Sequence, residues 1–372
     1  MNTPRENRMA ALALFLAAAV TWGPAMAADS FSVVAARPFF DADRGESVSF
    51  SVAVPEPGTV TVALYDLGHR RVKTLLDGTR LAAGISTVTW RGDTDGGGRA
   101  GAGQAFVAAG TLVTASGQTL SWDPATRSGG ETVPMSLLDC TYDPRAKLVR
   151  FAVRSPARVR IRAGVREGPL LRTILEWAPR LAGEFGEAWD GMDETGTIDL
   201  AARRDLSLVA SAYTLPDGAV LTAGAVSEST GLLAPKAGDD RRAVAIRQKA
   251  LQSKTAVDGH YLAAQAAESV PAFRVEFLDP KTNAAGLPVV GSRAALRVTL
   301  DEPTAGQMLQ DRFEIVVHVD MKRVFEEEQG YNPYAVEFST DGFAGGEHLL
   351  SVSVASLADR ISTVSRKFAI ER

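Results

Sequence analysis

Short segments in which apolar and polar residues alternate dominate this sequence. "VSFSVAV" (48–54) and "TVTVALYD" (59–66) alternate with a period of two, and "PEPG" between them is a typical hairpin connection. "LVRFAV" (148–153) and "RVRIRA" (158–163) repeat this arrangement around "RSPA". A period of two places alternate side chains on opposite faces of a strand. The pattern therefore predicts two strand hairpins, each with one apolar face.

The two hairpins belong to a longer repeat. Shifting the chain by 99 residues aligns 50–92 with 149–191 without a gap, and ten of these 43 positions are identical. A period near 100 residues is the size of a domain rather than of a solenoid repeat. The sequence therefore predicts a tandem duplication of one β-sandwich module.

Each copy contains a Gly, then a Trp six residues later, then a Gly and acidic residues. We expect the Trp to end a strand and cover one end of the core, the Gly residues to adopt positive φ, and the Asp side chains to bind backbone amides. The residues with this structural role are Gly84, Trp90, Gly92 and Asp93 in the first copy and Gly183, Trp189, Gly191 and Asp193 in the second.

Residues 37–112 resemble the immunoglobulin-like domain of the flagellar hook-capping protein FlgD. The resemblance rests on the starting "RPFF", the segment "YDLGHRRVKTLLDG", the phrase "LAAGISTVTWRGDTDGGG" and the final strand "AFVAAGTL". The second copy keeps Gly183 and "WDGMD" (189–193) but lacks the Tyr-Asp-x-x-Gly turn, so it is similar to a diverged member. The resemblance implies a small β-sandwich of the kind found in exported multi-domain bacterial proteins, and it does not imply hook capping.

The rest of the chain divides into two regions. Residues 235–270 are rich in helix formers and lack a strand period, which predicts short helices or a partly ordered linker. Alternating segments return from Pro271, including "ALRVTLD", "FEIVVHVDM" and "HLLSVSVAS", and predict a third sandwich similar to generic bacterial immunoglobulin-like domains. The fold expected is all-β: tandem immunoglobulin-like sandwiches with a short helical linker before the last. The predicted units are 1–27, 28–120, 121–234, 235–270 and 271–372.

The first of these units, 1–27, has the features of a signal peptide. Arg5 and Arg8 precede the apolar run "MAALALFLAAAV", and Ala25-Met26-Ala27 is a small-x-small cleavage site. The apolar run is too short to span a bilayer, and no comparable run follows it. We therefore expect a periplasmic, secreted or cell-surface protein that has no transmembrane segment after signal cleavage.

Composition excludes several classes of function. The formal net charge of -4 gives no reason to expect a nucleic-acid partner. The single cysteine, Cys140, excludes an internal disulfide, and four scattered histidines show no zinc-ligand spacing. No nucleophile elbow, phosphate-binding loop or metalloprotease motif is present, so we expect no catalytic residue, metal or cofactor. The acidic turns at 93–95 and 190–194 lack the spacing of a calcium loop, and turn chemistry is the favoured reading of them.

Arginines distinguish the second copy from the first. If the apolar residues of 148–163 face the core, the arginines share the outer face of the predicted hairpin; they are Arg150, Arg154, Arg158, Arg160 and Arg162. Their counterparts in the first copy are all neutral. Like charges across neighbouring strands destabilise a sheet, so acidic groups of a neighbouring domain, solvent and salt, or an acidic partner must offset them.

The function expected from these features is non-enzymatic. The first choice is a structural or assembly scaffold that binds other envelope or extracellular proteins. The alternative is a module that binds anionic polysaccharide through the arginine face, and an enzyme ranks third.

Overall fold

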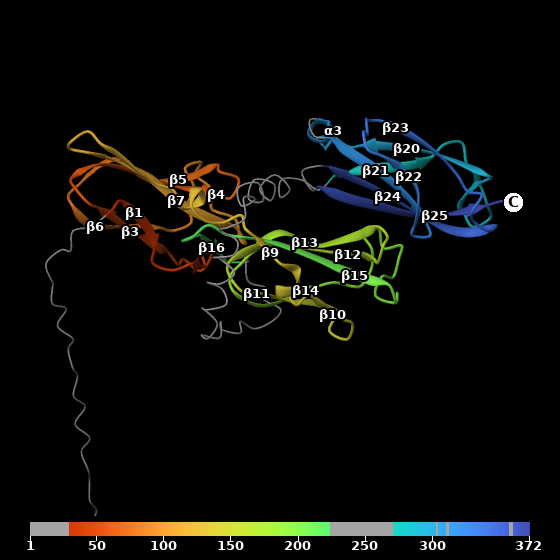
Figure 1. The fold of residues 1–372 in the computed structure, drawn as a ribbon, viewed down its shortest axis with the longest axis horizontal. Helices are drawn as coiled ribbons and strands as arrows, with labels where there is room; N and C mark the ends of the chain where they lie inside the picture. Colours follow the sequence, from red (N-terminus) through yellow and green to blue (C-terminus); the bar gives the residue numbers. More distant parts are fainter. Residues whose placement is uncertain (1–29, 224–270, 303, 310–311, 357–359) are drawn as a thin grey trace, which may run out of the picture.

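The computed structural model describes residues 30–223, 271–302, 304–309, 312–356 and 360–372 (Figure 1). These residues form β-sandwiches in a row, so the prediction of tandem immunoglobulin-like sandwiches is confirmed. The predicted signal peptide (1–27) and the predicted helical linker (235–270) lie outside the described residues.

The first sandwich, domain 1, has a small and a large sheet. The small sheet has the strand order β1 (Ser32–Ala35), β3 (Val48–Val54) and β6 (Gly84–Trp90). The large sheet has the order β2 (Phe39–Phe40), β16 (Val220–Thr222), β7 (Ala105–Thr114), β4 (Gly58–Asp66) and β5 (Arg71–Leu81), and β8 (Thr119–Trp122) also pairs with β7. Alternate residues of these strands, such as Val52 and Val62, are fully buried between the sheets.

The second sandwich, domain 2, repeats this arrangement. Its small sheet has the order β10 (Thr141–Asp143), β11 (Leu148–Val153) and β14 (Gly183–Ala188). Its other sheet has the order β13 (Leu170–Arg180), β12 (Ala157–Val165), β15 (Leu206–Thr214) and β9 (Thr132–Val133). Two 3₁₀ turns, η1 (Pro124–Thr126) and η2 (Met135–Leu137), lie on the path between β8 and β10.

The hairpin predictions are wrong. β3 pairs with β1 and β6, whereas β4 pairs with β5 and β7, so "PEPG" connects the two sheets of the sandwich. The same crossing separates β11 from β12. Each strand has one apolar face, and a sandwich buries two such faces by placing them opposite each other. Alternation along the chain therefore identifies the strands but does not identify the sheet to which each belongs.

The chain returns to domain 1 after it has completed domain 2. Leu221 of β16 pairs in parallel with Phe39 of β2 and antiparallel with Ala105 of β7, and Val220 and Leu221 are fully buried. β8 likewise extends domain 1 to Trp122. The structure thus differs from the predicted boundary at 120/121 and from the assignment of all of 121–234 to the second sandwich.

The third sandwich, domain 3, begins at the described residue 271. One sheet has the order β17 (Phe273–Phe277), β20 (Arg293–Leu300) and β23 (Tyr334–Ser339). The other has the order β18 (Lys281–Thr282), β19 (Pro288–Val290), β25 (Ile361–Ile370), β24 (Gly346–Ser356), β21 (Phe313–Val319) and β22 (Lys322–Glu327). The one-turn helix α3 (Thr304–Met308) packs on this core through Met308. Within the described residues, no helix has the length and apolar character needed to span a membrane.

Domain 3 contacts domain 2 through β25 and β13, which run close to each other in Figure 1. The Thr363 hydroxyl donates a hydrogen bond to the Leu170 carbonyl at 2.6 Å. Met321 and Leu349 of domain 3 also pack against the core of domain 2. The outer face of the β12–β13 sheet is therefore partly an interface between domains.

Candidate functional site

The repeated Trp makes the same turn in domains 1 and 2. The indole nitrogen of Trp90 donates to the Asp93 carbonyl at 2.7 Å, and that of Trp189 donates to the Met192 carbonyl at 2.9 Å. Trp90 is almost fully buried, and its ring packs edge-on against Phe40 and Phe106 at 5.2 and 5.0 Å. The ring thus closes the core, while its single polar atom is satisfied within the turn.

The glycines of the phrase all have positive φ, and two of them also need to be small. φ is +123° at Gly84 and +157° at Gly183. At Gly92 and Gly191, where φ is +84° and +91°, a Cβ atom would lie 2.7 Å from the Ala42 Cβ and 2.6 Å from the Ala201 Cβ respectively. These two positions exclude other residues because both conformation and space are restricted.

The acidic residue after the second glycine acts differently in the two domains. Asp193 is buried and accepts hydrogen bonds from the Thr197 and Ile198 amides at 2.6 and 2.8 Å. Asp93 instead forms an ion pair with Lys73. The hydrogen bond from Lys73 lowers the pKa of Asp93, and the same bond raises the pKa of Lys73. The two domains therefore share the turn, but the acidic side chain binds backbone amides in domain 2 and a lysine in domain 1.

The arginines do not share one outer face, and this prediction is wrong. Arg150 and Arg154 belong to the small sheet of domain 2, remain about half exposed, and pair with Asp143 at 3.4 Å and Asp139 at 2.9 Å. The other three lie on β12 in the opposite sheet. They are almost fully buried, with exposed fractions of 4% for Arg158, 6% for Arg160 and 5% for Arg162. The prediction failed because β11 and β12 are not hairpin partners.

Neighbouring domains and aromatic rings surround the β12 arginines. Burial lowers the pKa of Arg158 to about 10, and the negative charge of Asp66 in domain 1 acts in the opposite direction. The Arg160 guanidinium lies 4.4 Å from the centre of the Trp177 ring, which stacks on Tyr213 at 5.0 Å. Because these guanidinium groups are buried, they are not available to a polysaccharide. Arg158 lies near domain 1, whereas Arg160 packs on aromatic rings of domain 2 itself.

Other candidate chemistry is also restricted. Burial raises the pKa of the Cys140 thiol to about 11, so the thiol is protonated at neutral pH and is a poor nucleophile. Within the described ranges, no group of three His, Cys, Asp or Glu side chains is arranged to hold a metal ion. In the acidic turns, Asp95 accepts from the Thr74 amide at 3.0 Å, and Glu194 pairs with Arg172 at 3.4 Å.

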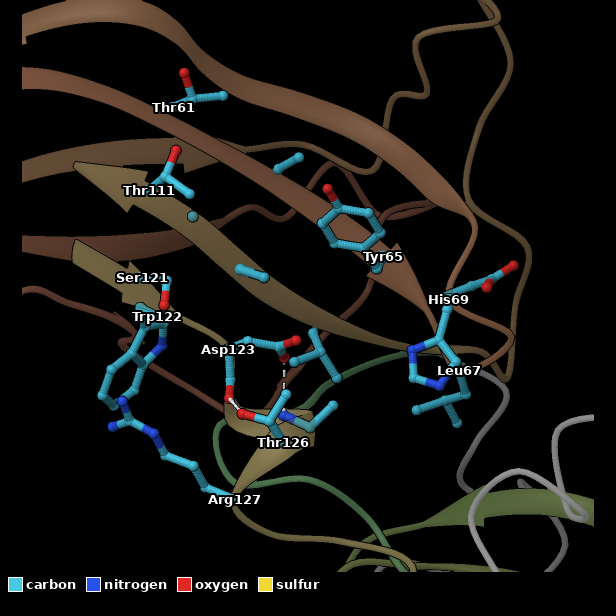
Figure 2. Close-up of a pocket in the computed structure, with 16 residues that line it drawn as sticks. Thr61, Tyr65, Leu67, His69, Thr111, Ser121, Trp122, Asp123, Thr126 and Arg127 are labelled. Atoms are coloured by element: carbon cyan, nitrogen blue, oxygen red, sulfur yellow. Dashed lines mark hydrogen bonds between the residues drawn. The ribbon is translucent and has the colours of Figure 1, made fainter. Parts of the chain in front are cut away.

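A groove of about 560 Å³ lies on the outer face of the large sheet of domain 1 (Figure 2). Its floor is formed by small side chains of β4 and β7, including Ala63 and Ala109. Figure 2 shows Tyr65 and His69 on one side of the groove and Asp123 and Thr126, from the end of β8 and from η1, on the other. A volume of this size is typical of small-molecule sites.

Local hydrogen bonds position the η1 side of the groove. Asp123 accepts from the Ala125 amide at 3.0 Å, and Thr126 donates to the Asp123 carbonyl at 2.8 Å, as the dashed lines in Figure 2 mark. Arg127 covers the Trp122 ring at 5.2 Å. The wall is therefore fixed by its own turn before any ligand is present.

Comparison with known proteins gives no family assignment, because no family model and no curated protein matches this chain. Solved structures that match this chain include the fibronectin(III)-like modules of Clostridium thermocellum CbhA, at 11% identity, with 91% of this chain and 93% of that chain covered and a TM-score of 0.20. A tetra-tandem repeat from the extending region of a large adhesion protein matches at 12% identity, with 92% and 74% covered and a TM-score of 0.21. A structure from a 1.5-MDa bacterial ice-binding adhesin matches at 10% identity, with 92% and 98% covered and a TM-score of 0.19. At these values the matches carry no argument about fold or function.

Sequence reasoning missed the groove and the Trp177–Tyr213 stack. Tyr65 contributed only to the family resemblance, and Trp122 fell outside the aligned repeat. The signal that was present is a mismatch within the repeat: Tyr65 aligns with Gly164, and Gly78 aligns with Trp177. In this chain, both exchanges of a glycine for an aromatic residue fall on faces that differ between the two domains.

Proposed function

We propose that this chain is an exported, non-enzymatic scaffold of immunoglobulin-like domains, the first two of the FlgD type. It acts in the periplasm or at the cell surface, where it binds other envelope or extracellular proteins. The signal-peptide pattern at 1–27 supports export.

One observation carries the scaffold proposal: part of the outer face of the domain 2 sheet is buried against the neighbouring domains. Arg158 lies in the field of Asp66 of domain 1, while Thr363 of domain 3 bonds to Leu170. β16 adds a further link, because it leaves domain 2 and completes the sheet of domain 1. Contacts of this kind hold the three domains at fixed positions relative to one another, which suits a protein that presents its surfaces to several partners.

The small sheet of domain 1 offers a face for a partner. Its strands β1, β3 and β6 contain no charged residue, and Val34 and Ile85 are 49% and 67% exposed on it. The equivalent sheet of domain 2 carries charged residues such as Arg150 and Glu184. Exposed apolar residues on an uncharged sheet are typical of interaction surfaces, whereas solvated sheets usually carry charges.

Site-specific photo-crosslinking in intact cells tests the proposal. A photoreactive residue at position 85 is compared with the same residue at position 184, which is the aligned position in domain 2. We expect a discrete crosslinked protein, of constant mass and stoichiometry, from position 85 and none from position 184. Equal labelling at both positions, or no protein adduct at either, contradicts a scaffold that uses this face.

A further inference from the structure

The outer face of the sheet that contains β4 in domain 1 and β12 in domain 2 differs between the two domains. In domain 2, β12 fills this face with three buried arginines that lie against neighbouring groups. The aligned β4 positions of domain 1 are Thr59, Thr61 and Ala63, and here the face is hollowed into the groove of about 560 Å³. The face that is covered in one copy is thus open in the other, and what it can bind follows from its lining.

The floor of the groove is flat. Ala63 pairs with Ala109, and Thr61 pairs with Thr111 two residues along, on the same face of the sheet. No side chain larger than Thr rises from these four positions, so a ring lying flat can approach the sheet closely. Thr61 and Thr111 supply hydroxyl groups at one end of the floor, as Figure 2 shows.

Aromatic groups flank this floor. Tyr65 follows Ala63 on the same face of β4 and lines the groove, and no hydrogen bond of its hydroxyl occurs among the described residues. Trp122 lines the other side, and its buried indole nitrogen has no hydrogen-bond partner in the part of the chain that the structure describes. A buried donor without a partner is costly, so this flank of the groove carries an unsatisfied polar atom beneath its surface.

The charges around the groove balance one another. Asp66 is held by Arg70 at 2.9 Å and by the Gly68 amide, so its carboxylate is already neutralised. Asp123 and Arg127 lie on the same flank and carry opposite charges. Because no net charge faces the cavity, the lining gives no advantage to an anion or a cation.

We propose that this groove binds a neutral oligosaccharide. A pyranose ring has apolar C–H faces that pack on aromatic rings and on a flat floor, and it has an equatorial rim of hydroxyls. In the groove, the rim hydroxyls meet the Asp123 carboxylate, the Tyr65 hydroxyl and the hydroxyls of Thr61 and Thr111. The volume of about 560 Å³ is within the range of small-molecule sites. This site does not depend on the scaffold function, because it lies on the sheet opposite the uncharged face of β1, β3 and β6.

The test is calorimetric titration of the full mature chain with neutral trisaccharides: cellotriose, maltotriose, mannotriose and tri-N-acetylchitotriose. At least one is expected to bind, with a Kd that changes less than about twofold between low and high salt, because no charge is paired. Tyr65→Ala is expected to weaken binding by about tenfold or more, because it removes the aromatic ring on which the sugar packs and the apolar area that this contact buries. Asp123→Asn keeps the cap of η1 and is expected to weaken binding several-fold without a change in folding.

Tyr331→Ala provides the matched control, because this tyrosine is 56% exposed in domain 3 and far from the groove in sequence. It is expected to leave the Kd unchanged. Three results overturn the proposal. The first is no binding of any of the four trisaccharides at about 10 mM, where only a free energy of binding weaker than about -3 kcal/mol would escape detection. The second is binding that Tyr65→Ala and Asp123→Asn leave unaltered, and the third is a Kd that rises about tenfold or more between low and high salt.

Discussion

Gly78 and Trp177 occupy equivalent positions in the two tandem domains and share a left-handed backbone conformation, with φ of +56° and +41°. Each lies in a bulge where β5 or β13 shifts register against its neighbour. This conformation costs a residue other than glycine about 1–2 kcal/mol. Trp177 is held in it by Arg160 at 4.4 Å and by Tyr213 at 5.0 Å. The packing of Trp177 against Arg160 and Tyr213 thus offsets the backbone strain at this position of domain 2.

Replacing Trp177 with glycine separates these two effects. Trp177→Gly relieves about 1–2 kcal/mol of backbone strain but removes a buried ring whose loss costs about 3–5 kcal/mol. We expect the free energy of unfolding to fall by about 2 kcal/mol, measured by urea denaturation. Gly78→Ala is the control: nothing lies within 4 Å of the added Cβ, so it should cost only about 1 kcal/mol of strain. A variant more stable than the wild type would contradict the role of Trp177.

Arg158 is expected to lower the free energy of unfolding rather than to raise it. Its Nε and Nη1 atoms are buried and lack hydrogen-bond partners among the described residues, and Asp66 is already paired with Arg70. Arg158→Met should therefore leave the free energy of unfolding unchanged or raise it by up to about 2 kcal/mol at pH 7. Arg160→Met, which removes the contact with Trp177, should lower it.

The pH dependence of Arg158 provides a second readout. Its pKa is lowered to about 10 in the folded protein, so above that pH the unfolded chain binds the proton more tightly. The stability of the wild type should therefore rise relative to Arg158→Met as the pH increases beyond 10. Loss of more than about 1 kcal/mol in Arg158→Met at pH 7 would instead indicate a net favourable buried pair.

Asp193 and Asp190 differ in what their removal leaves unsatisfied. Asp193 is 1% exposed, and without its carboxylate the Thr197 and Ile198 amides lose their acceptor, so Asp193→Ala should cost about 2–3 kcal/mol. Asp190 is exposed and accepts only from the Met192 amide at 3.0 Å, so Asp190→Ala should cost less than about 1 kcal/mol. Thermal denaturation of both variants measures the difference. Equal losses would mean that net charge, rather than hydrogen bonding, stabilises the turn.

The Lys73–Asp93 pair should stabilise domain 1 only between acid and strongly alkaline pH. The pKa of Asp93 is lowered from 3.8, so its contribution is lost as the pH falls below that value; the pKa of Lys73 is raised from 10.5, so the contribution is lost as the pH rises above it. Asp93 is 54% exposed, which limits the pair to less than about 1 kcal/mol. Lys73→Gln should lower stability by this amount at pH 7 and not at pH values near 2. Lys281→Gln, on the exposed strand β18, is the control, and an effect of Lys73→Gln that persists in acid would contradict the pairing.

The sequence was most informative in the duplicated region, where 50–92 aligns with 149–191. The alternation in "VSFSVAV" and the shared Trp90 and Trp189 predicted strands and a turn that depend only on local chemistry. The sheet to which each strand belongs could not be predicted, because β11 and β12 both have an apolar face and either would suit a hairpin or a crossing. The burial of Arg160 depends on neighbours that are distant in sequence, and alternation alone does not report them.

β16 shows the same limitation and allows a sharp test. Val220 follows domain 2 in the sequence, but it is fully buried in the core of domain 1, where it pairs with Phe106 of β7. Val220→Asp places an unpaired charge in that core, which should cost several kcal/mol, about 3 or more. Hydrogen exchange should then accelerate in β3 and β7 of domain 1, while β11 of domain 2 remains protected. Val220→Ala, which only removes methyl groups, should show the same pattern more weakly. Faster exchange in β11 without a change in β3 would mean that the segment belongs to domain 2 and that the strand return does not form in solution.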